Sequence, residues 1–319
     1  MTGLFFHYTT VDGLLGIVKD NSIRATDLRF LNDSCEGAIY VSALKNRLMS
    51  GAIAAYSKNA DINWTIVPPA QKSPEKAASA HVPALVESMV QGIHAQYPRF
   101  SVSLVAHEKE FTVKNGLLSQ WRGYGADGGI CLVLARGKIH EAAEAENEFG
   151  RGECIVKDVE YVADFESAKV EFGDINWDEI AADIPILIIG TLEQQVAAIK
   201  KHEVTFKAFI ESAPFFKHHA FEEEKEVRIL FAAKSQETID YYASINETEL
   251  QAAKLIEFRS RAGVMVPYVN IFEGRIRDAI QHIIIGPSPN ATRNKMAVQG
   301  LIDRYGLSAD TSISEIPLV

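Results

Sequence analysis

The order of strand-like and helix-like segments constrains the fold of this chain more than any other feature. Residues 4–8 have the pattern of a strand, and the next ten residues change at once to helical spacing, with their apolar positions on one side. Further strand patterns, at residues 129–135 and 224–231, are separated by helical stretches of very unequal length. Because strands and helices do not alternate regularly, we predict an α+β fold in which helices pack on a mixed or antiparallel central sheet.

Length and composition are those of an ordinary globular chain. The 319 residues are 47% hydrophobic and 23% charged, which excludes a disordered or collagen-like protein and allows a sizeable core. Residues 57–80 contain three prolines and many Ser, Ala and Lys residues, so this segment is predicted to be a loop or a mobile insertion. We therefore predict a single α+β domain, residues 1–319, that carries this insertion.

Charge and cysteine content restrict the classes of partner and compartment. A net charge of −10 argues against a strongly basic nucleic-acid binder, although a local basic groove is compatible with it. The three cysteines are too scattered for a zinc site, so no metal is predicted and a reducing cytoplasm is the simplest location. The first twenty residues lack a basic signal region, and no uncharged stretch reaches 18 residues. We expect a cytoplasmic protein with no membrane contact.

The stretch HYTT places His7, Tyr8 and Thr9 at the end of the first predicted strand, directly before a helix. Free backbone N–H groups at a helix N-terminus favour anionic ligands, so these side chains are candidates for a binding site. The alternative interpretation is structural, namely a buried histidine beside a helix cap.

The stretch LLSQWRGYGADGG gathers Gln120, Trp121, Arg122 and Tyr124 before a glycine-rich turn. Aromatic rings and a guanidinium group in this spacing could stack on a planar ring and hold a phosphate. In the alternative interpretation Trp121 belongs to the core and the glycines form a hairpin turn. The stretch is not a dinucleotide-binding fingerprint, because no G-x-G-x-x-G joins a strand to a helix here.

Alternation in the predicted strand at residues 224–231 puts Glu224, Glu226 and Arg228 on one face. A glutamate beside an arginine can bind a sugar hydroxyl or stabilise a cationic transition state, although a row of solvent-exposed charges gives the same pattern. Three further residues are weaker candidates for phosphate contacts: Arg259, Arg261 and Tyr268.

Two other functions are compatible with the acidic residues. Asn32, Asp33 and Glu36 fit ordinary helix-capping chemistry or a site. Carboxylates at positions 33, 36, 224 and 226 would suit Mg²⁺ or Mn²⁺, so a metal-dependent phosphodiester hydrolase is one alternative. A non-catalytic sensor that binds a nucleotide and signals to a separate partner is the other.

Five motifs, HYTT, FLNDSCE, LSQWRGYG, FEEEKEVR and IIIGPS, follow one another along nearly the whole chain. In this order they resemble a family of bacterial proteins of uncharacterised function, so the resemblance by itself implies no reaction.

The opening HYTTVDGLLGIVKDNSIRAT is similar, more distantly, to the opening of ADP-ribosyltransferases, including nucleic-acid-modifying toxins of bacterial defence systems. This resemblance implies that NAD is the substrate, that the nicotinamide–ribose bond is cleaved, and that a nucleic acid or protein accepts the ADP-ribose. The catalytic residues would be His7, which holds the nicotinamide ribose, and Glu226, or Glu224 if the register slips. Arg24 or Arg122 would hold the pyrophosphate. The implied binding set is His7, Tyr8, Thr9, Arg24, Gln120, Trp121, Arg122, Tyr124 and Arg228.

Overall fold

The computed structural model describes residues 3–31, 35–58, 64–65, 67–96, 98–125, 128–148, 152–162, 176–234, 236–246 and 253–317. Its contacts divide the chain into two units, each of which we describe by itself. The sheet unit comprises residues 1–31, 97–159 and 220–319, and the helical unit comprises residues 32–96 and 160–219. The single domain predicted for residues 1–319 stays a prediction, because two units with separate cores can belong to one domain.

Long helices form most of the helical unit. They are α2 (Cys35–Lys58), α3 (Pro74–Gln96), α7 (Trp177–Ile189) and α8 (Leu192–Ser212), joined by the short elements η2 (Pro69–Gln71), β6 (Glu160–Val162), η4 (Ala213–Phe215) and β7 (Phe216–His218). Helices α2, α3 and α7 share an apolar core that includes Leu48, Val82 and Ile184. The loop predicted at residues 57–80 therefore begins at the end of α2, and α3 starts within it.

The sheet unit is built on a large mixed sheet. Its strands are β1 (Leu4–Thr9), β2 (Ile23–Asp27), β3 (Arg99–Val105), β4 (Ile130–Ala135), β5 (Gly152–Asp158), β8 (Glu226–Ala233), β9 (Glu257–Arg261), β10 (Val264–Ile271), β11 (Ile280–Ile285) and β12 (Asp310–Ile313). They follow the order β12-β11-β4-β1-β3-β2-β10-β9, and β8 pairs with β3 and β5. The β11–β12 pair is parallel and the other pairs are antiparallel. The predicted α+β class with a mixed sheet is confirmed.

Shorter helices connect the strands of the sheet unit. They are α1 (Val11–Asp20), η1 (Leu28–Phe30), α4 (Glu110–Asn115), α5 (Leu118–Tyr124), α6 (Arg136–Glu148), η5 (His219–Glu224), α9 (Gln236–Asn246), α10 (Ile276–Ala279) and α11 (Ala291–Tyr305). Thr10 caps the first of them, since its hydroxyl accepts a hydrogen bond from the Gly13 amide at 3.1 Å. The expected change from strand to helix after residue 9 is therefore present.

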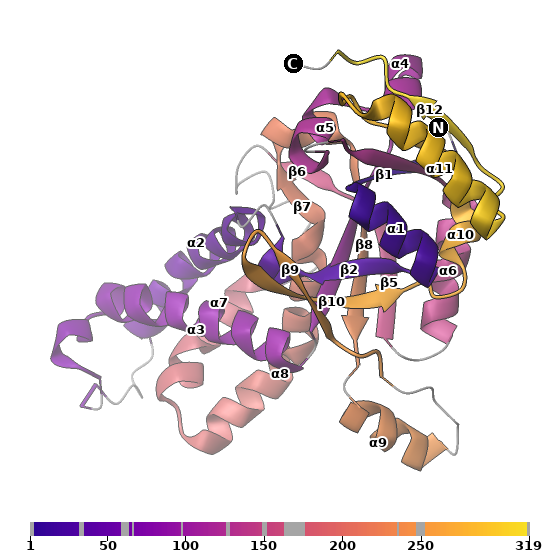
Figure 1. Cartoon of the computed structure of the whole chain (residues 1–319). Helices are drawn as coiled ribbons and strands as arrows, with labels where there is room; N and C mark the ends of the chain where they lie inside the picture. The colour runs from indigo at the N-terminus through magenta and orange to yellow at the C-terminus, as the bar shows by residue number, and fades with distance from the viewer. Residues whose placement is uncertain are drawn as a thin grey trace. The chain divides into compact units, whose positions relative to one another are not determined.

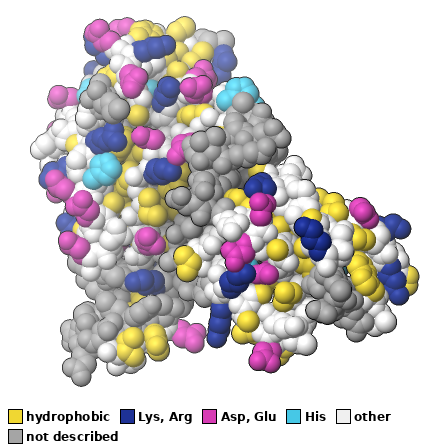
Figure 2. Space-filling model, turned by 180° about the vertical axis from the view of Figure 1, so that it is seen from behind, with side chains coloured by type: hydrophobic (Ala, Val, Ile, Leu, Met, Phe, Trp, Pro, Cys, Tyr) yellow, Lys and Arg dark blue, Asp and Glu magenta, His cyan; other side chains and the backbone are white. Residues whose placement is uncertain are grey.

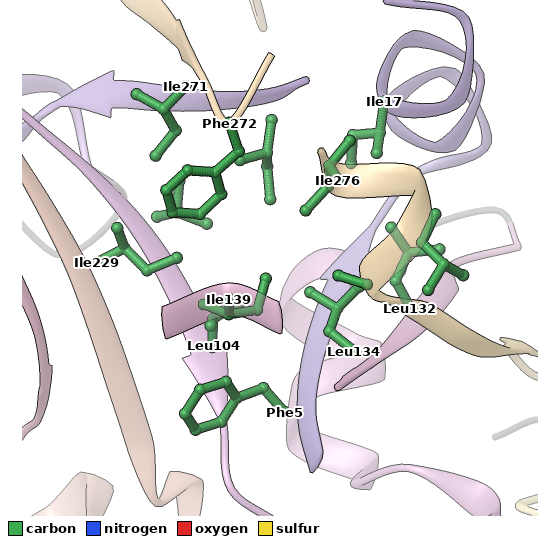
Figure 3. Packing of buried hydrophobic residues seen from close by; sticks show 14 of the residues in the cluster. Phe5, Ile17, Leu104, Leu132, Leu134, Ile139, Ile229, Ile271, Phe272 and Ile276 are labelled. Carbon is green, nitrogen blue, oxygen red and sulfur yellow. The ribbon is translucent and has the colours of Figure 1, made fainter. Parts of the chain in front are cut away.

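Alternation along the strands sends apolar side chains to one large core. Leu104 of β3 and Ile229 of β8 point into it together with Phe5 of β1, and helix α1 adds Ile17 (Figure 3). A smaller core lies on the opposite face of the sheet and contains Phe6, the neighbour of Phe5 on β1. The sheet is therefore buried on both faces near β1, which explains why residues 4–6 are all large and apolar.

Charged side chains are distributed over the face that Figure 2 draws. Figure 2 shows positive and negative side chains interspersed over the face that it draws. Within the residues that the structure describes, no helix is both long and apolar enough to cross a bilayer.

Candidate functional site

Strands β1 and β2 lie along the same edge of β3, because β8 pairs with the other edge over its whole length. Strand β1 meets β3 at Val105, whereas β2 meets it at Phe100 and Ser101. Residues 102–104, all of which the structure describes, have no strand partner on that edge. We call this place, where β1 and β2 separate, the β1/β2 split.

His7 contacts the edge of β3 inside the β1/β2 split. Its Nδ1 lies 3.1 Å from the carbonyl oxygen of Ser103. Since a carbonyl oxygen only accepts, Nδ1 carries the proton, and Nε2 of the neutral ring is left as an acceptor. Burial lowers the pKa of His7 below its usual value, and the positive charge of Arg259 acts in the same direction. The neutral ring is therefore favoured, and it offers Nε2 to a hydroxyl group.

Arg24 lies on β2, one of the two strands that border the β1/β2 split. Its guanidinium pairs with Asp20 of α1 at 3.5 Å. A Cβ added to Gly16 of α1 would lie 3.2 Å from Arg24 Nη2, so the glycine leaves room for this side chain. The structure thus brings two of the predicted residues, His7 and Arg24, to the strands that border the split.

A row of polar side chains crosses four neighbouring strands, β9, β10, β2 and β3. Register pairs Glu257 with Tyr268, Tyr268 with Thr26, and Thr26 with Ser101, so these four residues share one face and we call them the polar row. The Tyr268 hydroxyl donates to Glu257 at 2.6 Å. Figure 1 shows β2, β10 and β9 side by side.

Arg259 adds a positive charge to the polar row. It lies two residues after Glu257 on β9, and its Nη2 donates to Thr26 Oγ1 at 2.9 Å. Burial lowers the pKa of Arg259, and the charges of Arg261 and Arg24 lower it further. This part of the sheet therefore concentrates positive charge, in a chain whose net charge is −10.

Glu226 and Arg228 form a buried ion pair on β8. The guanidinium Nη2 lies 2.8 Å from Glu226 Oε1, and the exposed fractions of the two side chains are 4% for Glu226 and 3% for Arg228. Arg228 pairs with Ser103, the residue whose carbonyl oxygen His7 contacts. Register pairs Glu226 with Val105 and Val105 with Phe6, so Glu226 and Phe6 share a face of the sheet. His7 follows Phe6 in β1 and therefore points to the opposite face. The ion pair therefore lies on β8, across β3 from the split, and on the face opposite to the His7 side chain.

Glu224 is not part of the strand. The predicted strand at residues 224–231 begins two residues later, because Glu224 ends η5 and Lys225 has a left-handed backbone with φ of 46°. The expectation that Glu224 alternates with Glu226 on one face was wrong for this reason. Strand period does not apply across a residue with positive φ.

Tyr8 and Trp121 belong to the smaller core of the sheet unit. Their ring centroids are 4.9 Å apart in an edge-to-face arrangement, and both side chains are buried. The Tyr8 hydroxyl lies 2.6 Å from His107 Nε2 and accepts the Leu117 amide at 2.8 Å, while the Trp121 indole donates to the Asn115 carbonyl. This environment matches the structural interpretation of both residues.

Glycines surround the Trp121 indole. A Cβ on Gly116, Gly129 or Gly286 would lie between 2.7 and 3.2 Å from its ring atoms. The glycine-rich stretch after Trp121 thus allows close packing of the backbone on the indole. Gln120 is buried beside it, whereas Arg122 and Tyr124 are exposed, and Thr9 is half-buried at the end of β1.

The metal site that the sequence suggested as an alternative includes residues that lie outside the described part of the chain. Asn32 and Asp33 lie outside them, and so does the side chain of Glu36. Among the residues that the structure describes, no group of three His, Cys, Asp or Glu side chains could hold a metal ion. The metal-dependent hydrolase stays a prediction.

Thr26, Ser101 and Ser103 were not among the candidates predicted from the sequence, although the alternation in their strands marks them as polar positions. Thr26 alternates with the apolar residues of β2, and Ser101 and Ser103 alternate with those of β3. Such alternation shows which residues share a face. The sequence could not show that these strands are neighbours, because Thr26 and Ser101 are 75 positions apart.

Comparison with known families matches part of the chain to a family model. Residues 120–229 match a family model described as "Protein of unknown function (DUF2971)". This confirms the sequence-based resemblance to a family of uncharacterised function, over a segment that runs from Gln120 through the Glu226–Arg228 pair. No curated protein and no solved structure matches the chain.

Proposed function

We propose that this chain is an NAD-dependent enzyme of the ADP-ribosyltransferase type. It would cleave the bond between nicotinamide and ribose and transfer ADP-ribose to a macromolecule, either a nucleic acid or a protein. The proposed site is the β1/β2 split together with the polar row. Both lie within the sheet unit, so the proposal does not depend on the helical unit.

The observation that carries the proposal is the hydrogen bond of His7. Its Nδ1 is occupied by the Ser103 carbonyl at 3.1 Å, which fixes the ring and leaves Nε2 as an acceptor. A neutral acceptor of this kind suits a ribose hydroxyl, which is a neutral donor. Arg24 of β2 and Arg259 of β9, whose charge acts on His7, would supply positive charge for the diphosphate of the same nucleotide.

The proposed reaction requires stabilisation of positive charge on the ribose. When the C1′–N bond breaks, its electron pair leaves with the neutral nicotinamide, and C1′ becomes oxocarbenium-like. The acceptor then forms a bond to C1′ and loses its proton to solvent or to a base. A carboxylate near C1′ stabilises the cationic centre.

Glu226 is the carboxylate that we assign to this role. It lies on the same face of the sheet as Ser101 and Thr26, and two N–H groups of Arg228 hold its Oε1 in place. His7 has the opposite orientation in β1, so it would reach the same ribose through the split. A second carboxylate on that face, Glu257, is exposed and accepts a hydrogen bond from Tyr268. The experiment below therefore includes both glutamates.

The cysteines support a cytoplasmic location for this activity. Cys131 and Cys154 are free and buried. Burial raises the pKa of both thiols, that of Cys154 to about 12, so they stay protonated and unreactive. Free thiols of this kind suit the reducing compartment that we propose.

The test incubates the full chain with NAD labelled in the adenosine moiety and with mixed DNA, RNA and protein acceptors. Label transfer and nicotinamide release would be measured for wild type and for His7→Ala, Glu226→Gln and Glu257→Gln. We expect a loss of about tenfold or more for His7→Ala. For Glu226→Gln we expect a loss of about a hundredfold.

Two control variants carry the same kinds of substitution elsewhere in the sheet unit, and circular dichroism shows whether Glu226→Gln is folded. His282→Ala removes a histidine that contacts Ser312, on β11, two strands from β1, and Glu222→Gln changes an exposed glutamate of η5. Both are expected to keep full activity. If the wild-type chain neither binds nor consumes NAD with any acceptor, the proposed function is wrong. If His7→Ala and Glu226→Gln keep wild-type rates, the assigned site is wrong.

A further inference from the structure

Three arginines gather where β2, β10 and β9 lie side by side, and we call them the arginine cluster: Arg24, Arg259 and Arg261. The Cζ atoms of Arg24 and Arg259 lie 5.1 and 5.9 Å from the centre of the same ring, that of Tyr268. Arg261 follows Arg259 by two residues on β9 and therefore has the same orientation. The cluster is thus a geometric feature that three strands build together.

The described contacts of the arginine cluster are mostly with neutral groups. Arg259 donates to the Thr26 hydroxyl, and Arg261 donates to the carbonyl oxygen of Phe30. Arg24 contacts Asp20 at 3.5 Å, with both side chains partly exposed. Glu257 is also near, but it accepts the Tyr268 hydroxyl. Like charges held together in this way repel one another, and an anion bound among them would remove that repulsion.

Two buried polar atoms beside the cluster have no hydrogen-bond partner among the described residues. They are Oγ of Ser101, whose side chain is 3% exposed, and Nε of Arg259. Both lie next to Thr26, because Ser101 pairs with it and Arg259 donates to it. Leaving such groups unpaired costs free energy, so their position points to a ligand that carries hydrogen-bond acceptors.

We propose that the arginine cluster, with the hydroxyls of Thr26 and Ser101, is a binding site for the diphosphate group of a nucleotide. Three guanidinium groups and two hydroxyls offer more donors than a single phosphate can use, and arginine matches phosphate oxygens in pairs. That NAD carries the diphosphate rests on the proposed function. Binding of a diphosphate to this site does not depend on the proposed function.

The site uses Arg259 and Arg261, which the sequence suggested only as weaker candidates for phosphate contacts. Its central side chains, Arg259 and Arg261, come from the hairpin of β9 and β10, outside the family match that ends at residue 229. The hairpin turns at Ala262 and Gly263, with φ of 49° and 81°, which gives the tight two-residue connection that holds both arginines in register. An insertion in this turn would move the arginines relative to Thr26.

The first test measures binding to the full chain by calorimetry, with inorganic pyrophosphate, ADP, AMP and adenosine as probes. We expect pyrophosphate and ADP to bind, AMP to bind more weakly, and adenosine to bind least. Affinity for ADP is expected to fall about tenfold or more in Arg259→Gln and in Arg261→Gln. Arg293→Gln, which removes an exposed arginine of α11, is the matched control and is expected to leave the affinity unchanged.

A second variant guards against loss of folding. Ser101→Ala removes a hydroxyl that has no partner among the described residues, so it is expected to fold normally and still to weaken ADP binding. If neither pyrophosphate nor ADP binds, or if ADP affinity is unchanged in Arg259→Gln, Arg261→Gln and Ser101→Ala, this inference is overturned. If ADP binding depends on these residues but NAD is not consumed, the diphosphate site stands and the proposed transferase function fails.

Discussion

Arg228 donates two hydrogen bonds to one carboxylate oxygen of Glu226, from Nε at 3.0 Å and from Nη2 at 2.8 Å, and both side chains are almost fully buried. The two residues are separated by one position on β8 and point to the same face. Such a pair stabilises the fold only while both members are present, because a single buried charge is very unfavourable.

Replacing Glu226 by Ala is therefore expected to lower the free energy of unfolding by about 3–5 kcal/mol. The double variant Glu226→Leu with Arg228→Met removes both charges and is expected to cost clearly less than the single variant. Urea denaturation followed by circular dichroism measures both. Equal losses in the single and double variants would contradict a charge-based role.

Gly286 is expected to tolerate no side chain. A Cβ there would lie 2.8 Å from the Trp121 ring and 2.9 Å from the Gly129 carbonyl oxygen, so Gly286→Ala should destabilise the protein by about 1–3 kcal/mol. Gly300→Ala is the control, since nothing lies within 4 Å in the middle of α11. It is expected to stabilise the chain by about 0.5–1 kcal/mol. Thermal unfolding compares the two, and equal melting temperatures would refute the packing argument.

Tyr8→Phe separates the structural role of Tyr8 from a role in stacking on a ligand. The variant keeps the aromatic ring but leaves the Leu117 amide and His107 without their hydroxyl partner, so it should lose about 1–3 kcal/mol of stability. If Tyr8 acts only in the core, the affinity for ADP stays at the wild-type value. A tenfold weaker affinity in a variant that is folded at the assay temperature would show that the hydroxyl serves ligand binding.

His107 makes stability depend on pH. Burial lowers its pKa from 6.5 to about 4, so the folded state keeps the ring neutral while the unfolded chain binds a proton below pH 6.5. Stability is therefore lost as pH falls from 6.5 to about 4, by on the order of 3 kcal/mol from this group. Chemical denaturation at several pH values measures the slope. His107→Gln is expected to reduce it, and an unchanged slope would show that other groups cause the pH dependence.

Local pattern was sufficient to predict several elements. The strand at the N-terminus and the helix that follows it each depend on near neighbours in the chain. Alternation and helical spacing report such structure directly. The α+β class also follows from local pattern, because it needs only the order of the elements.

Local pattern failed where one residue broke the period. The strand expected from residue 224 begins at Glu226, because Lys225 adopts positive φ. Alternation cannot reveal such a residue when it is neither Gly nor Asn.

The sequence alone determined the strand and helix order, the apolar core faces and the chemical character of the candidate residues. Only the tertiary structure decided which of these residues meet. His7 contacts Ser103 across 96 positions, and Arg259 contacts Thr26 across 233. The physical reason is that strand pairing is non-local: hydrogen bonds between backbones choose the neighbour and the register, and no local periodicity records that choice. Trp121 was therefore open to two interpretations in the sequence, and the glycines packed around it in the fold favour the core.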